Sequence, residues 1–129
     1  MVKVFVHGVP ETGAVWGDLL AALDERGVDD IAVLSPPGFG APIPAGFACT
    51  AREYAAWLIG ELEAIGEPVD LVGHDWGAGH TYAVAADRPD LLRTWLPTAA
   101  GSSIPTTSGT PPRRSGRRLG KARRSSRRW

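Results

Sequence analysis

A short segment between residues 69 and 86 limits most strongly the folds open to this chain. The apolar run 69–72 leads directly into the pentapeptide Gly-His-Asp-Trp-Gly at 73–77, and residues 78–86 then favour a helix. A strand that passes into a helix over so few residues must turn sharply, and glycines on both sides of Asp75 leave room for the turn. The segment therefore predicts a strand, a strained turn that exposes the Asp75 side chain, and a helix.

The remainder of the first hundred residues alternates between strand and helix patterns. Short β-branched and aromatic runs predict strands, whereas leucines at helical spacing predict helices. Thr50 and Glu53 stand at capping-box spacing before a helix that ends at Gly66. In chain order we expect a strand at 2–6, a helix at 15–26, a strand at 31–34, the helix between Thr50 and Gly66, a strand at 69–72, a helix at 78–86, and the start of a fourth strand at 93–97.

This alternation indicates an α/β fold. Strands that alternate with helices favour right-handed crossovers and a parallel sheet with helices on both faces, which is a three-layer α/β/α sandwich. A chain of 129 residues has room for one such domain. We place it at residues 1–100, and we predict that residues 101–129, rich in Arg, Ser, Pro and Gly, form a disordered basic tail.

The charges divide along the same boundary. Residues 1–100 carry all 14 acidic groups and five basic ones, whereas residues 101–129 carry nine basic groups and no acid. Three accounts of the tail are open. We favour a non-native extension such as an out-of-frame reading of a GC-rich gene. The others are an arm that binds nucleic acid through phosphate contacts, and an arm that binds the acidic body.

Export and membrane insertion find no support in the sequence. The first residues are too short an apolar run for a signal peptide, and no stretch approaches the ~20 apolar residues of a membrane helix. Cys49 is the single cysteine, so it has no partner for an internal disulfide, and we expect a packing or loop role for it. These features predict a cytoplasmic protein.

Three motifs occur together in one known family. They are the pentapeptide 73–77, the His-Gly-Val-Pro loop at 7–10 followed by Trp16, and the Ser-Pro-Pro-Gly-Phe-Gly loop at 35–40. In this order and spacing they resemble the α/β-hydrolase family, in particular the aspartate-nucleophile branch that contains epoxide hydrolases and haloalkane dehalogenases. Ser35 stands where that family commonly has an acid. The resemblance implies that residues 73–77 form the family's nucleophile elbow.

The resemblance also implies a mechanism. Asp75 would attack an electrophilic carbon to form an ester, which water would hydrolyse with help from a histidine base. Dehalogenases of this branch often have asparagine where Val9 stands, which favours epoxide or ester hydrolysis of a small molecule; we expect no cofactor or metal. The implied site comprises the nucleophile Asp75, the oxyanion-hole N–H groups of Trp76 and Val9, the substrate-binding residues His7, Gly8, Pro10 and Trp76, and the elbow glycines Gly73 and Gly77.

The histidines complicate this interpretation. We expect structural roles for His7 and His74, which would brace loops through hydrogen bonds, and a packed or exposed position for His80. The family's base comes late in the chain, yet no histidine follows His80. We therefore expect a truncated or frameshifted hydrolase with impaired turnover, an apolar sheet edge left uncovered, and marginal stability.

Two alternatives remain open. Asp75 could serve only as the cap of the helix that follows it, although capping needs neither of the flanking glycines. The chain could also be a non-catalytic binding or regulatory protein that keeps a hydrolase-like scaffold and binds nucleic acid through its basic tail.

Overall fold

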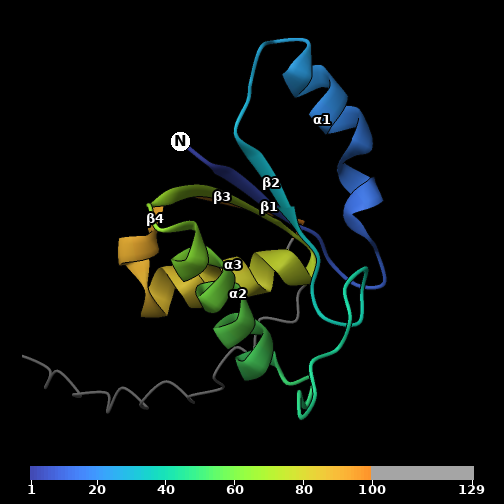
Figure 1. Ribbon diagram of the computed structural model, residues 1–129, viewed down its shortest axis with the longest axis vertical. Helices are drawn as coiled ribbons and strands as arrows, with labels where there is room; N and C mark the ends of the chain where they lie inside the picture. The colour runs from blue at the N-terminus through green and yellow to red at the C-terminus, as the bar shows by residue number, and fades with distance from the viewer. Residues whose placement is uncertain (100–129) are drawn as a thin grey trace, which may run out of the picture.

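The computed structural model describes residues 1–99, which form a four-stranded parallel sheet in the order β2-β1-β3-β4 with helices between the strands (Figure 1). Two short 3-10 helices cover Gly13–Trp16 and Pro89–Leu91. The elements are β1 (Lys3–Val6), α1 (Gly17–Asp24), β2 (Ile31–Leu34), α2 (Ala51–Ile65), β3 (Val69–His74), α3 (Trp76–Asp87) and β4 (Leu92–Thr98).

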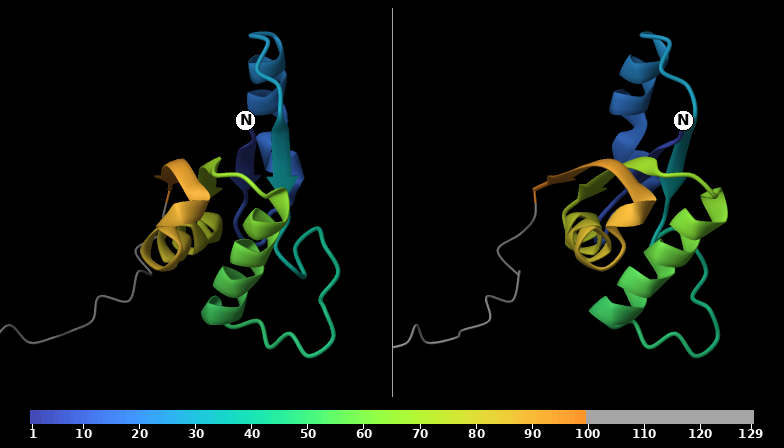
Figure 2. Two further views of the ribbon diagram at one scale, coloured as in Figure 1. Left: turned by 60° about the vertical axis from the view of Figure 1, so that its left-hand side comes forward. Right: turned by 90° about the vertical axis from the view of Figure 1, so that its left-hand side faces the viewer.

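The order of the strands places the helices on two faces. The chain moves outward from β1 to β2 through α1, then returns past β1 to β3 through α2, and continues outward to β4 through α3. Right-handed crossovers in opposite directions put α1 on one face of the sheet and α2 with α3 on the other, as Figure 2 shows. The predicted three-layer α/β/α arrangement with a parallel sheet is confirmed.

The main core lies on the face that α2 and α3 cover. It is an apolar cluster in which every member is almost fully buried, made of Val4, Val6, Leu58, Leu62, Val69, Leu71 and Val84. The opposite face is thinner, because no residue of α1 is buried and Leu19 is exposed. There Phe5 and Trp16 pack edge to face, with ring centroids 5.2 Å apart.

Several predicted boundaries change in the structure. The helix expected at 15–26 divides into the 3-10 turn Gly13–Trp16 and a shorter α1, which ends at Asp24, before Gly27 at φ 69°. The predicted helix at 78–86 begins two residues earlier, because the turn is completed at Asp75 itself. The capping box of Thr50 and Glu53 is confirmed, with both reciprocal bonds formed.

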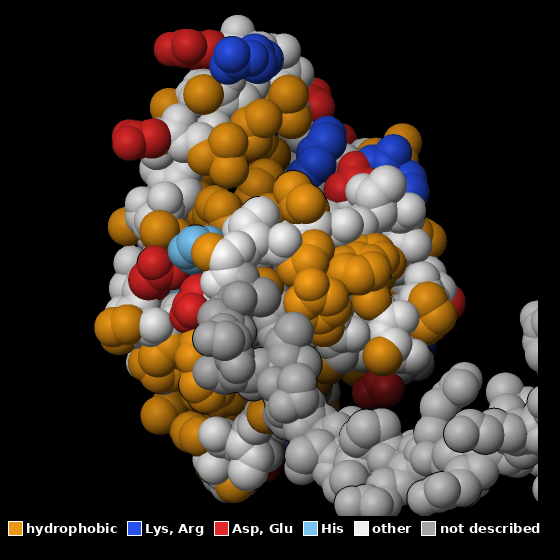
Figure 3. All heavy atoms as spheres, turned by 180° about the vertical axis from the view of Figure 1, so that it is seen from behind, with side chains coloured by type: hydrophobic (Ala, Val, Ile, Leu, Met, Phe, Trp, Pro, Cys, Tyr) orange, Lys and Arg blue, Asp and Glu red, His pale blue; other side chains and the backbone are white. Residues whose placement is uncertain are grey.

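The fourth strand is longer than its predicted start at 93–97, and it forms an edge of the described sheet. Trp95 and Leu96 are exposed, and Tyr82 of α3 packs edge to face against Trp95 at 5.6 Å. Hydrophobic side chains also gather on the surface shown in Figure 3. The expected uncovered apolar edge is therefore present in the part of the chain that the structure describes.

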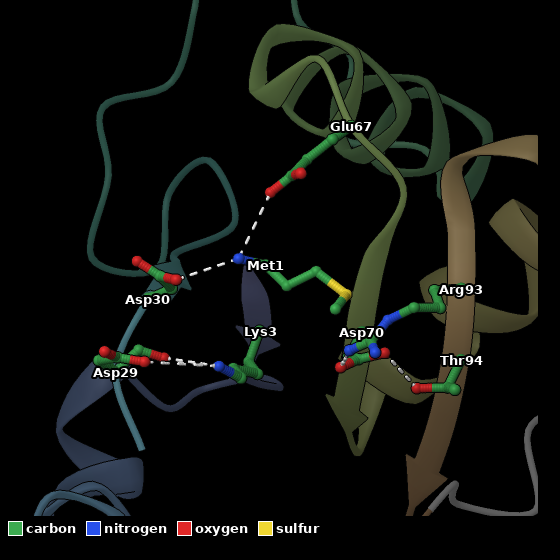
Figure 4. Close-up of polar contacts among 8 residues, drawn as sticks. All are labelled: Met1, Lys3, Asp29, Asp30, Glu67, Asp70, Arg93 and Thr94. Atoms are coloured by element: carbon green, nitrogen blue, oxygen red, sulfur yellow. Dashed lines mark hydrogen bonds and ion pairs between the residues drawn. The ribbon is translucent and has the colours of Figure 1, made fainter. Parts of the chain in front are cut away.

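The amino ends of the strands are joined by charged contacts (Figure 4). The N-terminal ammonium lies 3.0 Å from a carboxylate oxygen of Asp30, and Lys3 Nζ donates to the Asp29 carbonyl at 2.8 Å. At the other side, Asp70 pairs with Arg93 and accepts a hydrogen bond from Thr94. Nearly all the charges at this end are therefore neutralised by a neighbour.

The predictions for residues 101–129, both disorder and the nucleic-acid contact, lie outside the described residues. Within residues 1–99, no helix combines the length and hydropathy needed to cross a bilayer.

Candidate active site

The candidate site lies where the connections from two neighbouring strands run in opposite directions. The strands β1 and β3 are neighbours, but the connections after them leave toward opposite faces of the sheet. Such a switch point opens a crevice at the carboxyl ends of the two strands, and open α/β sheets place ligands there. Here the pairing of Val6 with Gly73 brings the loop at 7–10 beside the turn at 73–77.

Asp75 has the strained backbone that the sequence predicts. It is a non-glycine residue at φ 52° and ψ −115°, close to the first central position of a type II′ turn, where glycine is preferred. Its side chain makes no capping hydrogen bond to α3, although it occupies the N-cap position. The alternative that Asp75 merely caps the helix therefore lacks its defining contact.

The two elbow glycines permit an approach that no side chain would allow. A Cβ on Gly77 would lie 2.3 Å from the Val6 carbonyl oxygen, and one on Gly73 would lie 2.4 Å from the Gly77 carbonyl oxygen. Both contacts are with backbone, which cannot swing aside. These glycines thus let α3 begin directly against β1 and β3, where Asp75 faces the crevice.

The loop at 7–10 supplies the one hydrogen bond of the Asp75 carboxylate within the described residues. The Val9 N–H donates to Asp75 Oδ2 at 3.3 Å. Gly8 has no room for a Cβ, which would lie 2.4 Å from the same oxygen. The Val9–Pro10 peptide bond is cis. The structure thus brings together two residues that the sequence separates by 66 positions.

The remaining predicted site residues surround this contact. Trp76 is half-exposed and begins α3, so its N–H is one of the four that no helical carbonyl can satisfy. Pro10 is exposed at the rim of the loop. The oxyanion and substrate-binding roles of these residues stay predictions, and so does the nucleophilic role of Asp75.

His7 is fully buried, and both of its ring nitrogens have partners inside the protein. Nδ1 lies 2.9 Å from the Gly8 carbonyl oxygen, and Nε2 lies 3.0 Å from Ser35 Oγ. These bonds agree with the expected bracing role. No sequence pattern connects Ser35 with His7, since the contact depends on the pairing of β1 with β2.

Glu11 is a site residue that sequence reasoning missed. Its carboxylate accepts the Gly8 N–H at 3.2 Å and faces His74 Nε2 at 3.7 Å. The other nitrogen of His74 lies 3.2 Å from Thr98 Oγ1, whose residue also accepts the Asp75 N–H through its carbonyl at 3.1 Å. The available signal was position, because Glu11 directly follows the motif at 7–10.

His80 lies in the first turns of α3, buried and stacked on Tyr54 with ring centroids 5.3 Å apart. Burial lowers the pKa of the His80 imidazole to about 4.

Burial also raises the pKa of the Tyr54 phenol, with the Cys49 thiol adding to the effect. Tyr54 donates a hydrogen bond to the Pro37 carbonyl at 2.9 Å, which ties the loop at 35–40 to α2.

Other surfaces carry less chemistry. A hollow between α2 and α3, away from Asp75, is lined by alanines together with Ile59, Arg52 and Asp87. Within residues 1–99, His, Cys, Asp and Glu form no group that could hold a metal ion. The titratable groups at the carboxyl ends of β1 and β3 include the Asp75 carboxylate and the pair formed by Glu11 and His74.

Known proteins share the family and the fold of this chain. The family model described as "Alpha/beta hydrolase family" matches residues 4–129, across the domain boundary predicted at residue 100. The chain is 37% identical to "Epoxide hydrolase 2" of Siraitia grosvenorii over 94 residues, which are 70% of this chain and 29% of that protein. It is 35% identical to "Epoxide hydrolase" of Caballeronia sordidicola over 106 residues, 79% of this chain and 30% of that protein.

A solved structure shares the fold. The epoxide hydrolase CorEH superposes with a TM-score of 0.54 at 25% identity, over 74% of this chain and 33% of that one. The chain thus spans about a third or less of the length of each of these three proteins.

Proposed function

The chain belongs to the α/β-hydrolase family, and on that premise we propose that it carries the nucleophile half of an epoxide hydrolase-type active site, with Asp75 as nucleophile. The observation that carries the proposal is the Asp75 carboxylate, held at φ 52° on the elbow and bonded through one oxygen to the Val9 N–H. A strained residue aimed into a crevice is the arrangement expected of a reacting group.

The first step forms a covalent ester. Asp75 Oδ1 attacks one carbon of an epoxide ring, the bond between that carbon and the ring oxygen breaks, and the oxygen takes a proton from water to become a hydroxyl. The bond from Val9 to Oδ2 would fix the carboxylate so that Oδ1 faces the substrate. The peptide N–H of Trp76, at the start of α3, adds the positive end of the helix dipole at the carboxylate.

The second step releases the product. Water adds to the ester carbonyl carbon, the resulting oxyanion receives hydrogen bonds from the Val9 and Trp76 N–H groups, and the alcohol oxygen of the ester leaves with a proton as a diol. Within residues 1–99, which contain all three histidines of the chain, no histidine nitrogen bonds to Asp75. We therefore expect the ester to turn over ~10²–10⁴ times more slowly than with a positioned base.

The substrate class follows from the electrophile that a carboxylate can attack. An epoxide, an ester or an alkyl halide would qualify, and epoxide hydrolysis is favoured by the relatives and by Val9, which offers no side-chain amide to a leaving halide. A non-catalytic binding role gains no comparable support from the described residues.

Mass spectrometry of the intact chain tests the proposal. We expect incubation with styrene oxide to add the mass of one epoxide, and peptide mapping to place the addition on Asp75. The variant Asp75→Asn should gain no mass, whereas Asp30→Asn, which changes another aspartate at positive φ, should react like the unmodified chain. An unmodified Asp75 after prolonged exposure would contradict the nucleophile assignment.

A further inference from the structure

The peptide between Gly8 and Val9 lies against the Asp75 carboxylate, and its orientation is not set by its own sequence. Its N–H, that of Val9, points to Asp75 Oδ2. Residue 8 must be glycine because a Cβ would overlap the Asp75 carboxylate. Glycine is also the residue with the greatest backbone freedom, so the peptide needs an outside contact to hold its plane.

His7 supplies that contact from the carbonyl side. The Gly8 carbonyl belongs to the same peptide as the Val9 N–H, and it lies 2.9 Å from His7 Nδ1. A carbonyl oxygen can only accept, so Nδ1 must carry the proton. The neutral imidazole then has a lone pair at Nε2, which needs a donor because His7 is fully buried.

Ser35 is placed to be that donor. Its Oγ lies 3.0 Å from Nε2, and a hydroxyl can both donate and accept, whereas an ionised acid at this position could only accept. The neighbourhood of Ser35 is close, since a Cβ on Gly40 would lie 3.0 Å from the same hydroxyl oxygen. A side chain at residue 40 would therefore press on the Ser35 hydroxyl, and glycine leaves the hydroxyl at its contact with the ring.

We propose that Ser35 is a positioning residue: its hydroxyl donates to His7 Nε2, keeps the ring proton on Nδ1, and thereby holds the Gly8–Val9 peptide with its N–H toward Asp75. This role rests on the proposed function, because it matters to catalysis only if Asp75 reacts. A chain of three hydrogen bonds runs from the end of β2 through the end of β1 to the elbow after β3. It crosses the three strands that meet at the crevice.

The first test determines which nitrogen of the His7 ring carries the proton, and it needs no substrate. Nitrogen-detected NMR of the full chain should show His7 as the neutral tautomer protonated at Nδ1, and Ser35→Ala should shift the Val9 amide resonance. A His7 ring protonated at Nε2 in the unmodified chain would overturn the proposal, as would an unchanged Val9 amide in the variant.

The second test measures the rate at which styrene oxide labels Asp75. Ser35→Ala should lower the maximal labelling rate about tenfold while leaving the half-saturating epoxide concentration unchanged, because misplacing a group by a fraction of an ångström costs rate rather than binding. The control Thr94→Val also removes a hydroxyl bonded to a side chain, but at the amino end of the sheet, and should not change the rate. Equal rates in Ser35→Ala and the unmodified chain would overturn the positioning role.

The two proposals fail in different ways. If Asp75 of the unmodified chain is never labelled, the proposed function is contradicted, and the NMR measurement still decides whether Ser35 holds the Gly8–Val9 peptide. If Asp75 is labelled at the same rate in both chains, the proposed function stands and the role of Ser35 is wrong.

Discussion

The two ends of the sheet each hold an aspartate at nearly the same positive φ, and the two side chains make different contacts. Asp30 precedes β2 at φ 55°, and Asp75 follows β3 at φ 52°. Asp30 lies beside the N-terminal ammonium, which lowers the pKa of its carboxyl. Asp75 has no cation among its described contacts and accepts one backbone N–H. Charge is neutralised at the amino end and left available at the carboxyl end.

The two ends of the sheet also differ in how tightly they are packed. At the amino end, flexible and partly exposed side chains form ion pairs, which contribute little and are screened by salt. At the carboxyl end, glycines hold backbone against backbone, and the side chains that surround Asp75 come from loops fixed by hydrogen bonds. A positive φ thus occurs at both ends of the sheet, but only at Asp75 do glycines and close backbone contacts surround it.

The largest change in stability should come from adding a side chain at Gly77, where α3 lies against the backbone of β1. Gly77→Ala would place its Cβ 2.3 Å from the Val6 carbonyl, so we expect a loss of about 3 kcal/mol or more in the free energy of unfolding. Gly79→Ala is the matched control in the same helix, where nothing lies within 4 Å, and should be neutral or stabilise by up to about 1 kcal/mol. Urea unfolding measures both, and equal values would show that the elbow is not close-packed.

A second effect, no larger than the first, should appear in acid, because His80 is buried in the first turns of α3 with a pKa of about 4, against 6.5 when exposed. Between these values the unfolded chain binds a proton that the folded chain does not, so stability falls as the pH drops from about 7 and the loss levels off below about 4. The loss should reach about 3 kcal/mol.

Unfolding curves from pH 4 to 7 for the unmodified chain and for His80→Gln measure this contribution. The variant should show a shallower dependence on pH, whatever its absolute stability. Parallel curves would mean that His80 titrates alike in the folded and unfolded chains.

The smallest effect compares the two strained aspartates directly. Asp75→Gly removes strain of ~1–3 kcal/mol but adds freedom to the unfolded chain, so we expect a net stabilisation of about 1 kcal/mol together with loss of labelling. Asp30→Gly relieves a similar φ but gives up the contact with the N-terminus, so we expect no stabilisation and unchanged labelling. Thermal unfolding of both variants measures these changes in stability. A stabilised Asp30→Gly together with an unstabilised Asp75→Gly would show that the strain lies at Asp30 and not at Asp75.

Much of the fold was predictable, because periodicity and turn residues act locally. The alternation of apolar runs gave the parallel three-layer fold, and Thr50 with Glu53 marked the start of α2. The first helix was placed less well, since residues 13–16 form a 3-10 turn that packs Trp16 against Phe5, and Phe5 belongs to a strand 11 residues earlier (16 − 5 = 11). Local spacing cannot report such a contact.

The site divides along the same line. The sequence by itself determined the elbow, because the glycines at 73 and 77 and the strand-to-helix transition are local features that require a strained residue at Asp75. Only the tertiary structure decided what meets Asp75. The Val9 N–H and the link from Ser35 through His7 depend on β2, β1 and β3 lying side by side, and the pairing of strands is set by packing across the whole sheet.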